Sequence, residues 1–290
     1  MSSSPSTGRP PAHRALFISL INDASLFPPA ALEMGTALTD HATHRSGPDA
    51  DLVGPFLIGV SSVDVFVAAL DAGSPAPATI GLIARPGTPA GDVKAALSVL
   101  RGESRTRLVS IDAAWSQGWR DLDPGDLPIH LEVGREDRDT ALMDMASASD
   151  FADVRAKFRT GATSSWTWPD AAELADFIIA AGRHHLPFVL TGGLHHVVRG
   201  EHTLGDAVEQ QHGLLNVLVA VHARAGGSDV QTVGELLEIR DAEALAQIVR
   251  GWSVSDVAVV RAALAGYGCC DVTDPIAQLR SLDLLAPNGA

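Results

Sequence analysis

The sequence contains very little lysine and very little cysteine. Arginine provides 19 of the 21 basic residues, and the two lysines are Lys94 and Lys157. The two cysteines, Cys269 and Cys270, are adjacent in the sequence. Because neighbouring cysteines rarely pair with each other, a framework of disulfide bonds is excluded and reduced thiols are expected.

Long apolar runs and clusters of basic residues are also missing. No apolar run is long enough to cross a membrane, so a membrane protein is not expected. The net charge of −14 and the lack of a basic cluster argue against a nucleic-acid partner. The polar, proline-rich residues 1–13 lack the apolar core of a signal peptide, which predicts a flexible tail on a cytoplasmic protein.

Short apolar runs are abundant in the rest of the 290-residue chain, and helical patterns separate them. Strands are predicted at 15–21, 55–60, 79–85, 107–112, 128–133, 154–159 and 187–193. Nearly continuous apolar strands that alternate with helices are typical of a parallel sheet buried on both faces. The sequence therefore predicts an α/β protein with at least seven strand-and-helix units.

The C-terminal third of the chain completes the predicted architecture. Residues 204–263 show helical spacing, and the short stretch 266–272 is predicted to be an eighth strand. The predicted fold is a (β/α)8 TIM-type barrel over 14–290, with 204–263 as a helical insertion between strands seven and eight. An open doubly wound sheet is the alternative, but no G-x-G-x-x-G motif follows the first strand.

Strand six is the strongest candidate for a functional strand. Active sites of β/α barrels lie at the C-terminal ends of the strands, and side chains alternate between the barrel interior and the helices. Positions 154–159 alternate apolar and basic, so Arg155, Lys157 and Arg159 are predicted to point inward. On strand five, His130 and Glu132 share the inward face, which is expected to bring Glu132 beside Lys157. Other polar or glycine residues near strand ends are expected at the same mouth: Asp23, Asp112, Thr191, Gly192, Gly193, His195 and Arg199.

Lys157 permits two interpretations. A buried lysine near another cation loses its proton more readily than an exposed one, and its neutral amine can attack a carbonyl to form a Schiff base. Glu132 or Asp112 would then move protons during the reaction. Alternatively, Lys157 forms an ion pair with Glu132 and takes part in no chemistry.

Two short stretches add a resemblance to a known family. The sequences K-F-R-T-G-A at 157–162 and P-F-V-L-T-G-G-L at 187–194 resemble strands six and seven of class I aldolases of the deoxyribose-phosphate aldolase kind. The resemblance implies a Schiff-base role for Lys157 and an anion or phosphate contact at Gly192 and Gly193. The position of that family's second lysine, on strand seven, holds Val189 here.

The sequence leaves three functions open. The first is a lyase that acts on a small carbonyl or carboxylate compound, uses Lys157, Glu132 and Asp112 in catalysis, and needs no cofactor or metal. The second is a metal-dependent hydrolase or isomerase, with Asp23, Glu132, His195 and either His196 or His212 as ligands. The third is a barrel that binds a small anion without catalysis. The 204–263 segment would serve as a lid or as a contact in a homo-oligomer.

Overall fold

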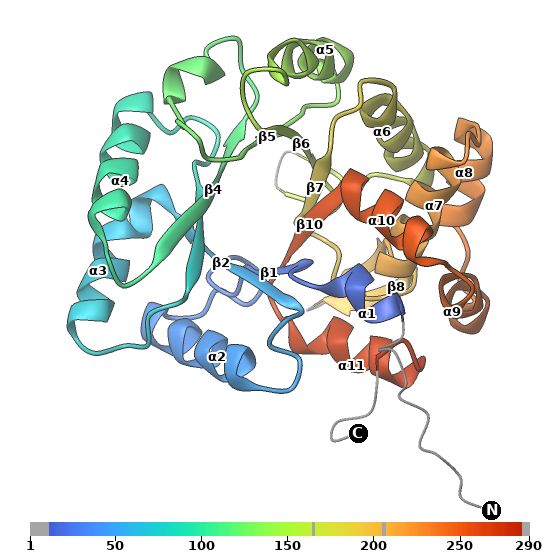
Figure 1. Cartoon of the computed structure of the whole chain (residues 1–290), viewed down its shortest axis with the longest axis horizontal. Helices are drawn as coiled ribbons and strands as arrows, with labels where there is room; N and C mark the ends of the chain where they lie inside the picture. The colour runs from blue at the N-terminus through green and yellow to red at the C-terminus, as the bar shows by residue number, and fades with distance from the viewer. Residues whose placement is uncertain (1–11, 164–165, 205–206, 286–290) are drawn as a thin grey trace, which may run out of the picture.

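Eight parallel strands close into a barrel in this computed structural model, which describes residues 12–163, 166–204 and 207–285 (Figure 1). The strand order around the barrel is β1-β10-β7-β6-β5-β4-β3-β2. The strands are β1 (Ile21–Asp23), β2 (Val53–Gly59), β3 (Thr79–Ile83), β4 (Arg107–Ala114), β5 (Ile129–Glu132), β6 (Val154–Arg159), β7 (Phe188–Thr191) and β10 (Leu264–Cys269). The predicted (β/α)8 fold is confirmed.

Helices surround the barrel and cover the outer faces of its strands (Figure 1). They are α1 (Ala12–Phe17), α2 (Met34–Ser46), α3 (Val63–Asp71), α4 (Ala90–Gly102), α5 (Arg138–Ala148), α6 (Ala171–Arg183) and α11 (Thr273–Ser281), with short 3₁₀ turns η1 (Val60–Ser62) and η2 (Trp119–Leu122). Helix α6 begins with a capping box, because the Asp170 carboxylate accepts the Glu173 N–H and the Glu173 carboxylate accepts the Asp170 N–H. In the described part of the chain, no helix combines the length and the apolarity that a membrane span needs.

The start of the chain differs from the sequence-based prediction. The strand predicted at 15–21 is wrong, because Ala12–Phe17 form helix α1 and β1 begins only at Ile21. Leu16 and Phe17 are fully buried, and α1 packs against a later helix, α10 (Val254–Ala263). A short apolar run suits a buried helix as well as a buried strand, so its periodicity could not separate the two. Most of the predicted tail at 1–13 lies outside the described residues.

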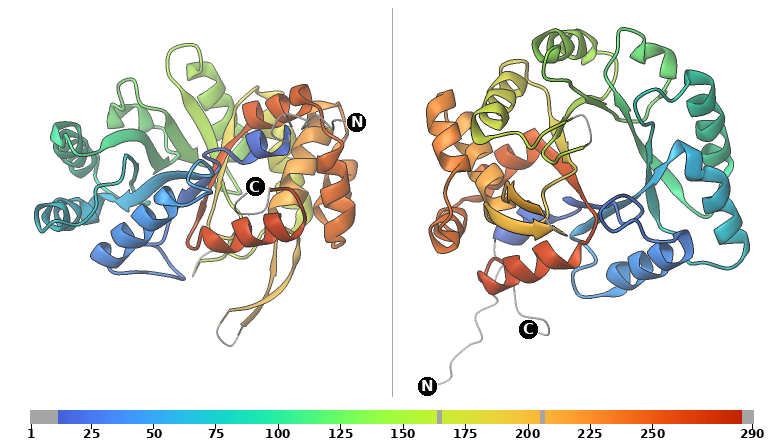
Figure 2. Two further views of the ribbon diagram at one scale, coloured as in Figure 1. Left: turned by 60° about the horizontal axis from the view of Figure 1, so that its bottom comes forward. Right: turned by 180° about the vertical axis from the view of Figure 1, so that it is seen from behind.

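The insertion between β7 and β10 contains a hairpin as well as helices. Strands β8 (Gly200–Leu204) and β9 (Ala207–Gln211) pair antiparallel, so the helix predicted from residue 204 actually begins at residue 214. Figure 2 shows this hairpin extending away from the barrel. Four helices follow it: α7 (Leu214–Ala225), α8 (Val230–Leu237), α9 (Ala242–Arg250) and α10. Of these, α7 and α8 contact α6, which attaches the insertion to one side of the barrel.

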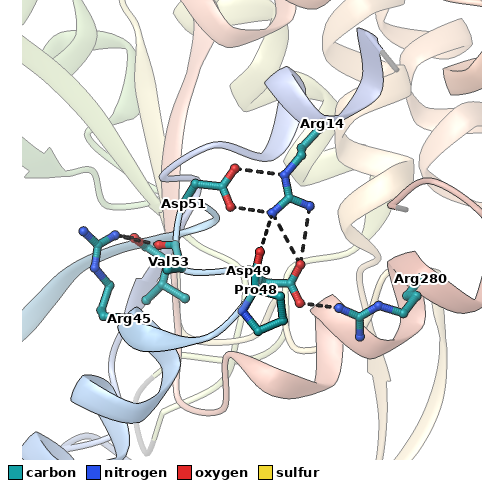
Figure 3. Close-up of polar contacts among 8 residues, drawn as sticks. Arg14, Arg45, Pro48, Asp49, Asp51, Val53 and Arg280 are labelled. Carbon is teal, nitrogen blue, oxygen red and sulfur yellow. Dashed lines mark hydrogen bonds and ion pairs between the residues drawn. The ribbon is translucent and has the colours of Figure 1, made fainter. Parts of the chain in front are cut away.

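The loop before β2 connects the first and last described helices (Figure 3). Arg14 of α1 donates from Nε to Asp51 Oδ2 at 3.0 Å and from Nη2 to the Pro48 carbonyl at 3.0 Å. Arg280 of α11 donates to Asp49 of the same loop. Because α1 and α11 are bound to one acidic loop, the two ends of the described chain are fixed side by side.

Candidate active site

Polar side chains from three neighbouring strands meet inside the barrel. In the sheet register Asp112 of β4 lies opposite His130 of β5, and Glu132 of β5 lies opposite Lys157 of β6. These residues occupy alternate positions, so their side chains share the inward face of the sheet. Asp112, Glu132 and Lys157 lie in the C-terminal halves of their strands, which is the end where barrel enzymes have their active sites, and His130 lies one turn of the pleat deeper.

Lys157 is buried at the centre of this cluster and is only 4% exposed. Its Nζ donates to Asp112 Oδ2 at 2.8 Å and lies 3.7 Å from Glu132 Oε2. The nearer carboxylate therefore belongs to β4, two strands away, although the sequence indicated Glu132 of the adjacent strand. The expected Lys157–Glu132 ion pair is present only as the longer of two contacts.

Glu132 is held mainly by Arg159, at the more exposed side of the cluster. Arg159 Nε donates to Glu132 Oε1 at 2.9 Å, and Arg159 Nη2 donates to Glu132 Oε2 at 3.4 Å. Both side chains are partly exposed, whereas Asp112 and Lys157 are buried. The cluster thus has a buried pair and an outer pair, and the contact from Glu132 to Lys157 joins them.

His130 is a member of the cluster to which the sequence assigned no role. Its Nδ1 lies 2.8 Å from Asp112 Oδ1, and its Nε2 is buried without a hydrogen-bond partner in the described structure. Burial raises the pKa of Asp112, but the charge on Lys157 and the contacts with His130 outweigh it and hold that pKa well below its usual range. Asp112 is therefore an anion beside the lysine amine. Strand alternation had placed His130 on the inward face, and that was the available signal.

Close packing explains the glycines after β7. Gly192 has a φ of +81°, and a Cβ there would lie 2.6 Å from Arg159 Nη1. A Cβ on Gly193 would lie 2.5 Å from Trp168 Cζ3, and one on Gly161 would lie 1.4 Å from the Gly192 carbonyl oxygen. The loop after β6 and the end of β7 can approach this closely only because these residues have no side chain. The anion contact expected of the two glycines stays a prediction.

Thr191, at the end of β7, lies inside the barrel near β10. Its Oγ1 is 3.7 Å from the position that a Cβ on Gly268 would occupy. In the register Thr191 lies opposite Arg159. The structure thus brings Thr191 to the same end of the barrel as the charged cluster.

Asp23 lies against helix α2, away from the cluster. Its Oδ2 is 2.9 Å from His41 Nδ1, and its Oδ1 accepts the Ser25 N–H at 3.0 Å. The neighbouring Asn22 points inward instead, because its side-chain atoms lie 2.4 Å and 3.3 Å from the positions of a Cβ on Gly54 and on Gly266. The strand had been predicted at 15–21, where helix α1 ends at Phe17 and a turn follows, so the pattern of apolar residues there did not report the face of β1.

Arg199 lies between the hairpin and the inserted helices. Its Nε donates to Glu238 Oε2 at 3.0 Å, its Nη1 lies 3.1 Å from His212 Nδ1, and its backbone N–H donates to Asn216 Oδ1 at 2.9 Å. His212 Nε2 also lies 2.9 Å from the Pro169 carbonyl oxygen. These contacts join the base of the insertion to the start of α6, and they do not bring Arg199 to Lys157.

His195 lies beside the two cysteines at the end of β10. Its Nδ1 is 3.5 Å from Cys270 Sγ and 3.8 Å from Cys269 Sγ. Burial lowers the pKa of His195, although nearby carboxylates oppose the shift. Within the described residues, no group of three or more His, Cys, Asp or Glu side chains is arranged to hold a metal ion.

Comparison with known proteins adds little to this geometry. No protein-family profile matches the chain, and no curated protein matches its sequence. Among solved structures, the chain is similar to a crystal structure of a Coccidioides immitis protein provisionally named a fructose-1,6-bisphosphate aldolase. The identity is 12% and the TM-score 0.32, and the match covers 89% of this chain and 77% of that one. A similarity of this extent identifies no activity for this chain.

Proposed function

We propose that this protein is a barrel lyase of the aldolase type, which forms a Schiff base between Lys157 and a small carbonyl compound. One observation carries the proposal: a lysine amine inside the C-terminal half of the barrel, 2.8 Å from the buried carboxylate of Asp112. Lysine nucleophiles that attack carbonyl groups are buried amines with acid and base groups in reach. The substrate is a small molecule, the proposed reaction needs no cofactor, and a cytoplasmic location stays a prediction.

The residues around Lys157 can be given separate roles. The amine must release a proton before it attacks, and Glu132 Oε2, 3.7 Å from Nζ and partly exposed, is placed to accept it. When the neutral amine has attacked, one of its two remaining protons moves to the former carbonyl oxygen and gives a carbinolamine. Glu132 would then return the first proton to that hydroxyl, which leaves as water when the iminium ion forms. Asp112 would stay ionised and stabilise the positive charge of the iminium nitrogen.

Arg159 and His130 would act as positioning residues. Arg159 holds the Glu132 carboxylate through two N–H groups and lies at the exposed side of the cluster, where its other N–H groups can meet a substrate oxygen. His130 holds Asp112 Oδ1, which leaves Oδ2 to face the lysine. This division separates proton transfer at Glu132 from charge stabilisation at Asp112.

The scarcity of lysine makes a sharp test possible. Lys94→Arg leaves Lys157 as the only lysine, and Lys157→Arg leaves Lys94, an exposed residue of α4, as the matched control. Each variant is incubated with pyruvate, dihydroxyacetone or acetaldehyde, reduced with borohydride and mapped by mass spectrometry. The double variant gives the background from the α-amino group.

The expected result is a stoichiometric reduced adduct on Lys157 in the wild type and in Lys94→Arg, with at least one of the three carbonyl compounds. Lys157→Arg should show only the background of the double variant. If no compound gives an adduct on Lys157 above the level on Lys94, the cluster is an ion-pair network and the Schiff-base proposal is wrong.

A further inference from the structure

A cavity opens at the C-terminal ends of β2 and β3. It has a volume of about 570 Å³, and Gly59 and Ile83, the last residues of these two strands, line it. The rest of its wall comes from the loop after β1 at Phe27, the loop after β3, the first turn of α3, and one side of α4 as far as Val99. None of the residues that bind Lys157 lines this cavity, so the candidate active site does not account for it.

Arg85 is the cationic side chain of the cavity wall. Its guanidinium carbon lies 5.6 Å from the centre of the Phe27 ring, and the described residues offer it no ion-pair partner. The hydroxyls of Ser61 and Ser62 fold back toward the end of β2, at 3.9 Å and 3.7 Å from the position of a Cβ on Gly59. Neither hydroxyl has a hydrogen-bond partner among the described residues. An arginine and two hydroxyl donors at the edge of a concave surface suit an anionic group.

The cavity is connected to the Lys157 cluster through one pair of neighbouring residues. Ile83, which lines it, lies opposite Asp112 in the register of β3 and β4, and the Ala84 N–H donates to the Asp112 carbonyl at 2.8 Å. Since neighbouring strands lie about 4.8 Å apart, the path from Gly59 across Ile83 to Asp112 is roughly 10 Å. An extended chain of about nine atoms would cover it.

Two carboxylates in the cavity wall restrict the ligand further. Asp64, in the first turn of α3, and Asp92, in the first turn of α4, both line the cavity. A ligand with several negative groups would be repelled, whereas hydroxyl groups can donate hydrogen bonds to these carboxylates.

We infer that this cavity binds the anionic end of a hydroxylated carbonyl substrate, with Arg85 on its phosphate or carboxylate and Asp64 and Asp92 on its hydroxyl groups. The inference rests on the proposed function of Lys157, which would receive the carbonyl end of the same molecule. It places the anion contact on the opposite side of the mouth from Gly192 and Gly193. The substrate class is therefore a short hydroxylated chain with one acidic end.

The binding of compounds that have no aldehyde or ketone group, and so cannot form a Schiff base, tests this inference separately from the proposed function. We would titrate glycerol 3-phosphate, glycerate and glycerol into the wild type, Arg85→Gln and Arg107→Gln by calorimetry. Arg107 is the matched control, because it is exposed, has no ion-pair partner in the described structure and lies at the opposite end of the neighbouring strand β4. Phosphate and carboxylate are distinguished by which of the two acids binds more tightly.

Saturable binding of glycerol 3-phosphate or glycerate is expected, with none for glycerol. Arg85→Gln should weaken the binding at least tenfold and Arg107→Gln should leave it unchanged. Absence of saturable binding, or equal binding by the two variants, would overturn the inference. In borohydride trapping, Arg85→Gln should reduce the yield with glucose 6-phosphate, whose open-chain aldehyde and phosphate are far enough apart to span the path, and not with glucose.

The two proposals fail in different ways. If Lys157 traps no carbonyl compound while glycerol 3-phosphate or glycerate binds through Arg85, the Schiff base is wrong and the anion site stands. If Lys157 traps the phosphorylated compound equally well in the wild type and in Arg85→Gln, the anion site is wrong and the Schiff base stands. Lys157→Arg should bind glycerol 3-phosphate as the wild type does, because the site lies on other strands.

Discussion

At the scale of single residues, the environment of Lys157 is set by the inside of a closed sheet. Alternation along β5 and β6 was enough to predict that Glu132 and Lys157 face inward and lie side by side. Inside a barrel, however, a long side chain also reaches strands that are not its neighbours. The contact with Asp112 on β4 depends on barrel curvature and side-chain length, which a pattern in the sequence does not encode.

Replacing Asp112 by asparagine should destabilise the protein by about 3 kcal/mol at pH 7, because a buried lysine loses its nearer carboxylate. Urea unfolding measures the change. Asp153→Asn is the control, since Asp153 pairs with Arg155 at the surface and should cost less than about 1 kcal/mol. Equal effects of the two substitutions would mean that the buried ion pair contributes no more to the stability of the protein than the surface pair does.

The stabilisation from Asp112 should also depend on pH. Its pKa is lower in the folded protein than in the unfolded chain, where it is about 3.9. The stabilisation from ionised Asp112 is therefore complete above the unfolded pKa, and it is lost as the pH falls through the lower pKa of the folded protein. The difference in unfolding free energy between the wild type and Asp112→Asn should be constant from pH 7 to about pH 5 and should shrink below about pH 4. A difference that grows on acidification would contradict the assignment.

At the scale of elements, strand six and its helix were predictable, whereas the segment before β1 and the insertion between β7 and β10 were less so. The bounds of β6 match the prediction, because basic and apolar residues alternate without interruption. The run before β1 and the hairpin at β8 and β9 were assigned wrongly. Both are short, and their structure depends on what packs against them, α10 in one case and the pairing of two polar strands in the other.

The contact between the loop after β6 and the end of β7 gives a prediction at this scale. Gly161→Ala should destabilise the protein by about 3 kcal/mol or more, because its Cβ would overlap the Gly192 carbonyl oxygen. Gly134→Ala, where nothing lies within 4 Å of the added Cβ, should change stability by less than about 0.5 kcal/mol. Thermal and urea unfolding of the two variants test this, and a tolerated Gly161→Ala would show that the loop moves freely.

At the scale of the whole molecule, the closed sheet protects its interior as one unit. Each barrel strand pairs with two neighbours, so no strand of the barrel has a free edge. The predicted barrel followed from the repeated alternation of strands and helices, a global pattern that tolerates errors in single elements. Because the sheet is closed, a reagent too large to enter the mouth of the barrel should reach Lys157 only when the barrel unfolds.

Amine labelling measures this protection directly. A bulky amine-reactive ester should modify exposed Lys94 quickly and Lys157 at least about a thousandfold more slowly, given unfolding free energies of about 5 kcal/mol or more. Peptide mapping over time gives both rates in one sample. Similar rates at the two lysines would reveal a local opening of β6 that the closed barrel does not predict.

The shared acidic loop at Asp49 and Asp51 also bears on how the chain can be reconnected. Because Arg14 and Arg280 both reach this loop, a flexible linker could join α1 to α11, at the two ends of the described chain, without crossing the barrel. New ends could then be opened after β5, near Gly134, where the backbone has space. Such a circular permutant would keep every strand pair of the barrel, but its strands would be synthesised in a different order. It would therefore separate the effect of synthesis order from that of the final structure.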